Sequence, residues 1–136
     1  MGLDQYILRG SHNVTPKLGK NDEWEYCEEI CYLRKAYWLH NIILDIGMEK
    51  LDVKDKDELN TKFIPLTREE LQDIVQKGKE VTSTKSIFML DEYFDYEVYS
   101  DNELSCVIQD IKEWNMIMHR YLRNSKKTEY YYWSWW

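Results

Sequence analysis

The chain has 136 residues, a formal net charge of −7 and 15% aromatic residues, among them eleven Tyr and six Trp. This length accommodates one domain with a substantial core and is too short for two. The acidic excess argues against nonspecific binding to duplex DNA, which requires Lys and Arg to replace counterions. The aromatic side chains exceed what a small core needs, which favours stacking on a ligand or an interface with another protein.

The cysteines and the hydropathy of the chain favour an intracellular protein. Cys27, Cys31 and Cys106 form no metal-type CxxC pair. We expect all three to be reduced. Neither a signal peptide nor an apolar segment of membrane length is recognised, so we expect no association with a membrane.

Residues 2–9, GLDQYILR, are predicted to form an N-terminal strand. Leu3 and Ile7 would share one face, and Tyr6 and Leu8 would take the other. Because both faces carry apolar groups, this strand is expected to be covered on both sides.

The next segment, residues 10–21, is rich in Gly and small polar residues and is predicted to be a loop, in which His12 is solvated. Residues 22–45 then form the longest run with apolar residues at helical spacing. We predict that this run is one central, largely enclosed helix. Gly47 is expected to stop it.

Residues 49–60 are charged and are predicted to be an exposed connection with room for a short helical turn. The segment FIPLT at 63–67 leads into the next helix, where Thr67 and Glu70 form a capping box. Gly78 is expected to end or weaken that helix.

The spacing of the apolar residues changes in the next segment. Residues 87–90 are predicted to be a buried strand that leads into a tyrosine-rich stretch. Ser100 and Glu103 form a second capping box, which begins a long amphipathic helix. The basic residues at the end of this helix, among them His119 and Arg123, suit the negative end of the helix dipole. The aromatic tail TEYYYWSWW is predicted to be a terminal strand.

The order of these elements predicts an α+β fold. A small, mostly antiparallel sheet would be covered by two or three helices in a single domain, residues 1–136. The two terminal strands are expected to be neighbours, since both are too apolar to lie free in water.

Five motifs occur in the order GLDQY, EEICYLRKAYWLH, TREELQDIV, EYFDYEVY and YYYWSWW. In these motifs the chain resembles a family of small tailed-bacteriophage proteins without an assigned activity. Its members open with MGLDMYL or similar, carry E-x-x-Y-W-R-K-A-x-x-I-H in a long helix and close on an aromatic segment. The chain departs at Leu33 and Ile42, where the family often has Trp. The matching positions are Gly2, Leu3, Asp4, Tyr6, Glu29, Tyr32, Arg34, Lys35, Ala36 and His40. The resemblance implies a location in the cytoplasm of an infected bacterial host.

Residues of this motif and of the tail could bind a small anionic aromatic ligand. Arg34 and Lys35 suit a phosphate or a carboxylate, and His40 can donate, accept or titrate. Aromatic rings nearby could stack on a base. The predicted ligand-binding residues are therefore Tyr32, Arg34, Lys35, Trp38, His40, Tyr132 and Trp133. On a helix, Arg34 and His40 lie on different lines, so a second subunit of a homo-oligomer could complete the site. The alternative is structural, with Arg34 paired to an acid and His40 satisfied within its helix.

Three functions are compatible with these residues. The first is a phage protein that sequesters a nucleotide-type immune signal of the host, such as an ADP-ribose derivative or a cyclic nucleotide, without cofactor, metal or catalytic residue. The second is an interaction module that inhibits a host or phage protein. The third is a small nucleotide hydrolase that uses His40 with the acidic cluster Asp91, Glu92, Asp95 and Glu97. Binding is favoured because the sequence has no Gly-rich phosphate loop, nucleophile elbow or HExxH motif.

Overall fold

The computed structural model describes residues 2–10, 14–84, 101–123 and 129–136, and all structural statements below concern these residues. The strands are β1 (Asp4–Gly10), β2 (Lys17–Leu18), β3 (Trp24–Glu25), β4 (Cys27–Arg34), β5 (Ile64–Leu66) and β6 (Glu129–Trp135). The helices are α1 (Tyr37–Lys50), α2 (Arg68–Thr84) and α3 (Asp101–Leu122), with short 3-10 turns η1 (Lys20–Asp22) and η2 (Lys56–Leu59). The predicted α+β class is confirmed. The predictions for His12, the strand at 87–90, the acidic cluster and Ser100 lie outside the described residues.

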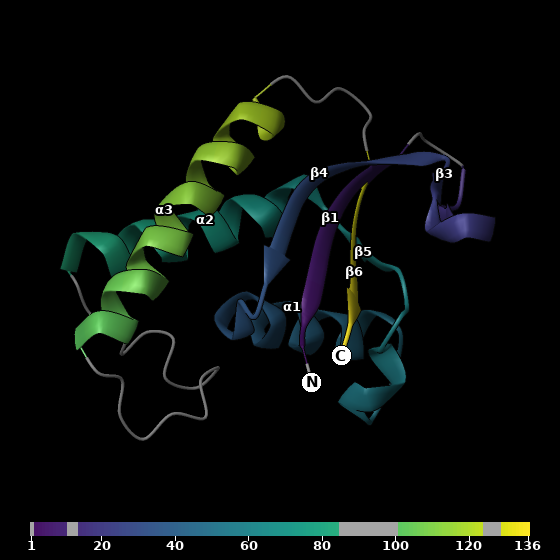
Figure 1. Ribbon diagram of the computed structural model, residues 1–136, viewed down its shortest axis with the longest axis horizontal. Helices are drawn as coiled ribbons and strands as arrows, with labels where there is room; N and C mark the ends of the chain where they lie inside the picture. Colours follow the sequence, from purple (N-terminus) through teal and green to yellow (C-terminus); the bar gives the residue numbers. More distant parts are fainter. Residues whose placement is uncertain (1, 11–13, 85–100, 124–128) are drawn as a thin grey trace.

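The main sheet has the strand order β4-β1-β6-β5, and each neighbouring pair is antiparallel. The strand β1 lies beside β6, with Tyr6 opposite Trp133 and Ile7 opposite Tyr132. Figure 1 shows the two ends of the chain side by side at one edge of the molecule. The prediction that the terminal strands are neighbours is therefore confirmed.

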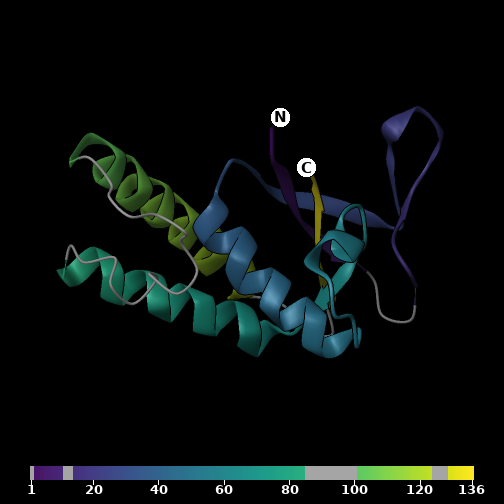
Figure 2. The ribbon, with the colours of Figure 1, turned by 90° about the horizontal axis from the view of Figure 1, so that it is seen from below.

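Both faces of the sheet are covered, as predicted for its first strand. On one face α1 crosses the strands, and α2 and α3 pack against each other beside it (Figures 1 and 2). Ile7 contributes to this larger core and is 1% exposed. Leu8 points to the opposite face, where it packs in a smaller cluster that includes Trp133 and is flanked by Trp24 of the β2–β3 hairpin.

The prediction of one helix over residues 22–45 is wrong in its first half. Residues 27–34 form β4, which pairs with β1, and the helix begins only at Tyr37. A bulge explains the error: Ile7 is opposite Cys31 and Leu8 is opposite Glu29, so Ile30 is the extra residue. An inserted residue stretches the period of two to a spacing of three, which imitates a helix in the sequence.

Gly47, expected to stop a helix, and Gly78, expected to end or weaken one, both lie inside helices. Gly47 lies within α1, which continues to Lys50, and Gly78 lies within α2, which continues to Thr84. Both are buried at contacts between elements. A Cβ at Gly47 would lie 2.9 Å from Ile64 Cδ1, and one at Gly78 would lie 2.8 Å from Ile111 Cγ2. Their missing side chain therefore serves close packing rather than helix termination.

The capping box at the start of α2 is confirmed. The backbone N–H of Thr67 donates to Glu70 Oε1 at 2.9 Å, and the backbone N–H of Glu70 donates to Thr67 Oγ1 at 3.1 Å. The charged connection before it contains a helical turn, η2. Cys27, Cys31 and Cys106 are free cysteines. Across the described parts of the chain, no helix combines the length and the apolar character required to cross a membrane.

Candidate functional site

The residues predicted to bind a ligand are distributed over several elements: Tyr32 and Arg34 (β4), Lys35 (the turn after β4), Trp38 and His40 (α1), and Tyr132 and Trp133 (β6). The structure brings His40 and Tyr132 into direct contact. The others lie in three further environments, which are described in turn. Their role in ligand binding stays a prediction.

Tyr32, Arg34 and Lys35 lie at the surface where β4 ends. The Tyr32 hydroxyl is exposed and donates to Asp4 Oδ1 at 2.6 Å. The chain turns at Lys35, whose φ is 58°, and the backbone N–H of Lys35 donates to the Leu3 carbonyl at 2.9 Å. These contacts join the first strand to the β4–α1 turn, and none of the three side chains lines the cavities described below.

Trp38 lies in the core between helices. It is 2% exposed and packs edge-on against Trp114 of α3, with ring centroids 6.3 Å apart. Such a contact stabilises the packing of α1 on α3. In this position the Trp38 ring has no face open to a ligand.

His40 and Tyr132 belong to a buried polar cluster. The Tyr132 hydroxyl lies 2.8 Å from His40 Nδ1 and accepts a hydrogen bond from Gln5 Nε2 at 3.0 Å. Gln5 also bonds both backbone groups of Ala36, so its amide orientation is fixed. Burial, assisted by the nearby Lys56 ammonium, lowers the pKa of His40 to about 4, and the imidazole is therefore neutral at pH 7.

Trp133 faces the opposite side of the sheet and lines a cavity of about 570 Å³. Aromatic rings and acidic side chains line this cavity together: Tyr6, Trp24 and Trp135, with Asp4, Asp22 and Glu29. Burial raises the pKa of Tyr6, and the carboxylates of Asp4 and Glu29 raise it further. This negative surrounding disfavours the anionic ligand that the sequence predicts.

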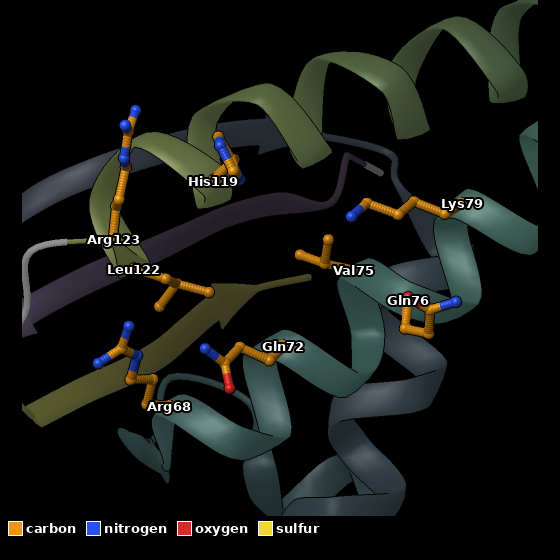
Figure 3. Close-up of a pocket in the computed structure, with 8 residues that line it drawn as sticks. All are labelled: Arg68, Gln72, Val75, Gln76, Lys79, His119, Leu122 and Arg123. Atoms are coloured by element: carbon orange, nitrogen blue, oxygen red, sulfur yellow. The ribbon is translucent and has the colours of Figure 1, made fainter.

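A different cavity, of about 400 Å³, lies between α2 and α3 (Figure 3). From α2 it is lined by Arg68, Gln72, Val75, Gln76 and Lys79. His119 and Leu122 of α3, and Arg123 directly after α3, line its other side. These spacings of three and four residues place each set on one face of its helix. We call this cavity the α2–α3 groove.

The groove is strongly basic although the chain is acidic. Its lining carries three permanent cations, Arg68, Lys79 and Arg123, and there is no Asp or Glu among the described residues that line it. Figure 3 shows Lys79 and Gln72 pointing into the space between the helices, while Arg123 extends outward from the rim on α3. Concave surfaces lined by one sign of charge raise the local concentration of oppositely charged ligands. The groove is therefore suited to an anion.

Its floor and its polar groups fit a phosphate-bearing molecule. Leu122 and Val75 approach each other between the helices and form an apolar floor (Figure 3). Guanidinium groups bind phosphate oxygens in pairs, and the Lys79 ammonium acts as a point charge. The lining residues include no Ser, Thr, Cys, Asp or Glu that could act as nucleophile or carboxylate base. The arrangement can hold an anion.

The sequence pointed elsewhere because these residues look unremarkable in it. His119 and Arg123 were expected only to complement the dipole of α3, and the polar side of α2 drew no assignment. The signal available in the sequence is a pair of basic stripes. One includes Arg68 and Lys79, and the other includes His119 and Arg123. That signal points to a site only once α2 and α3 are known to pack side by side.

The chain was compared with protein-family models, curated proteins and solved structures, and none of them matches it. The site is therefore defined by its own geometry. Within the described residues, no group of three or more His, Cys, Asp or Glu side chains is placed to hold a metal ion.

Proposed function

We propose that the protein binds a small phosphate-bearing ligand, without transforming it, in the α2–α3 groove. The observation that carries this proposal is that Arg68, Lys79 and Arg123 line one cavity, among whose described lining residues there is no Asp or Glu. The volume of about 400 Å³ falls within the range of small-molecule sites.

A nucleotide-type ligand suits the groove better than inorganic phosphate alone. The apolar floor of Val75 and Leu122 would contact a base or a sugar, while Gln72 and Gln76 offer amide donors and acceptors to its polar edge. Together with the resemblance to small phage proteins, this supports a role in sequestering a nucleotide immune signal, such as an ADP-ribose derivative or a cyclic nucleotide, inside an infected bacterial cell.

A ligand screen by thermal shift tests the proposal. The probes are pyrophosphate, ADP-ribose and a cyclic dinucleotide, each measured at low and at high KCl. We expect at least one of them to raise the melting temperature, since a ligand that binds only the folded state stabilises it. This effect should shrink with added salt, because the attraction is electrostatic.

Two outcomes would contradict the proposal. One is the absence of stabilisation by any phosphate compound at millimolar concentration. The other is stabilisation that KCl leaves unchanged. Chromatography of the recovered ligand completes the test: intact ligand agrees with binding alone, whereas a cleaved product would make the protein a hydrolase and overturn the non-catalytic part of the proposal.

A further inference from the structure

A second cavity, of about 330 Å³, lies where α1, η2 and the two chain ends meet, and His40 is part of its lining. Only 6% of the His40 surface is exposed, so the side chain is buried behind the cavity wall. The rings of Tyr37 and Trp136 also line this cavity. We call it the His40 pocket. It shares no lining residue with the α2–α3 groove.

The hydrogen bonds behind the pocket fix which imidazole nitrogen carries the proton. Gln5 Oε1 accepts from the backbone N–H of Ala36 at 2.7 Å, which identifies Gln5 Nε2 as the donor to the Tyr132 oxygen. The Tyr132 oxygen thus receives one hydrogen and has its own to give. We infer that His40 Nδ1, at 2.8 Å, is the acceptor for it. A neutral imidazole whose Nδ1 accepts must carry its hydrogen on Nε2.

The Nε2–H group is therefore the polar group that His40 has left to offer to the pocket. None of the described residues forms a hydrogen bond with Nε2. A ligand atom that accepts from this N–H would form a hydrogen bond with it inside the pocket. The ring of Trp136 stands edge-on to His40, with centroids 4.6 Å apart, and the partly exposed Tyr37 ring lies at the same pocket.

The charges around the pocket favour an uncharged ligand. The lining holds one cation, Lys56, and one anion, Asp57. Lys56 also forms an ion pair with Asp45, with Nζ 3.3 Å from Oδ1. The lowered pKa of His40 agrees with this, since the imidazole adds no positive charge at pH 7.

We propose that the His40 pocket binds a flat, uncharged heteroaromatic ring, such as a nucleobase, which accepts a hydrogen bond from His40 Nε2 and packs against Trp136 and Tyr37. Tyr132 and Gln5 are positioning residues that hold His40 in the donating tautomer. This site is separate from the proposed phosphate site and does not depend on it.

Adenosine, which has a base and no phosphate, is the probe. Imidazole signals in a nitrogen-correlated NMR spectrum should assign His40 to the Nε2–H tautomer, and added adenosine should shift the His40 signals and leave those of His119 in place. Trp136→Ala should weaken adenosine binding at least about tenfold, as expected for loss of an aromatic stacking partner. Arg120→Ala, which alters neither the His40 pocket nor the α2–α3 groove, should leave it unchanged.

Tyr132→Phe tests the positioning role. It removes the hydroxyl that donates to Nδ1, and the His40 signals should then move toward a mixture of tautomers even where the protein stays folded. An Nδ1–H tautomer in the parent protein would overturn the proposal. So would adenosine binding that leaves the His40 signals in place, or the absence of any adenosine binding.

Discussion

The burial of the His40 side chain makes the stability of the folded protein depend on pH. Its pKa is lowered from 6.5 to about 4, first by burial and second by Lys56. Between these values the unfolded chain takes up a proton that the folded protein does not. His40 therefore leaves the free energy of unfolding at its full value above about pH 6.5. As the pH falls toward 4, protonation of His40 in the unfolded chain lowers this free energy by up to about 3 kcal/mol.

Urea unfolding at pH 7 and at pH 4.5 measures this loss. Other groups also titrate in this range, so the parent protein is compared with His40→Gln, whose amide can accept from the Tyr132 hydroxyl but does not titrate. We expect the free energy of unfolding of the parent to fall by about 2–3 kcal/mol more than that of the variant. Equal losses in the two proteins would show that His40 is not the titrating group.

At the scale of elements, Gly78 determines how closely α2 and α3 approach. In an exposed helix, Gly→Ala stabilises by roughly 1 kcal/mol. Here the added Cβ would lie 2.8 Å from Ile111 Cγ2 and about as close to Asn115 Oδ1, at 3.0 Å. We expect Gly78→Ala to destabilise the protein by about 1–3 kcal/mol instead, as measured by thermal unfolding.

A double variant separates this clash from a change in helix propensity. Ile111→Ala removes the methyl group that meets the new Cβ. Adding Gly78→Ala to an Ile111→Ala background should therefore cost less than adding it to the parent, with a coupling of about 1 kcal/mol or more. Strictly additive effects would mean that the two residues do not compete for space.

The elements also show how far local pattern predicts this fold. Some elements are predictable because each carries a local signal of its own. They are the strand β1, the capping box at Thr67 and the helix α3. The strand β4 is not, because the bulge at Ile30 hides its alternation. Its conformation is decided by pairing with β1, a contact between segments distant in the sequence.

The candidate site was predicted less well than the fold for the same reason. His40 and Tyr132 lie in contact, whereas Trp38 and Trp133 lie on opposite sides of the sheet, and the role of all four in ligand binding stays a prediction. The α2–α3 groove depends on how two helices pack, and no single stretch of sequence contains that information. Basic residues on two separate helices form one site only where the folded chain packs those helices together.

At the scale of the whole molecule, the C-terminal strand holds the sheet together. The strand β6 lies between β1 and β5, and Trp133 and Tyr132 are buried on opposite faces of it. Deleting residues 133–136 should remove the pairing of Tyr6 and its neighbours with β6. We expect a loss of several kcal/mol, enough to unfold a domain of ordinary stability.

Circular dichroism and thermal unfolding of this truncated protein test the role of β6. A matched control is Trp135→Ala, which removes a ring that is 59% exposed and leaves the strand intact. The control should unfold within a few degrees of the parent. A truncated protein with the melting temperature of the parent would contradict the central position of β6.

The distribution of charge gives the molecule its proposed function. A chain with a net charge of −7 concentrates Arg68, Lys79 and Arg123 around one groove, whereas the cavity on the other face of the sheet collects carboxylates. Anions should be repelled from most of this surface and attracted to the groove. We therefore propose the groove as the binding site for a phosphate-bearing ligand.

Calorimetric titration of a matched pair of arginine variants tests this claim most directly. The titrant is the phosphate compound that stabilises the parent protein most. Arg123, directly after α3, lines the groove, whereas Arg120, in the last turn of α3, is also exposed and does not line it. Both variants, Arg123→Ala and Arg120→Ala, remove the same charge. We predict that Arg123→Ala weakens binding by about 1.5–3 kcal/mol, roughly tenfold or more, and that Arg120→Ala changes it by less than about threefold. Equal losses in the two variants, or none in either, would contradict a phosphate site in the α2–α3 groove.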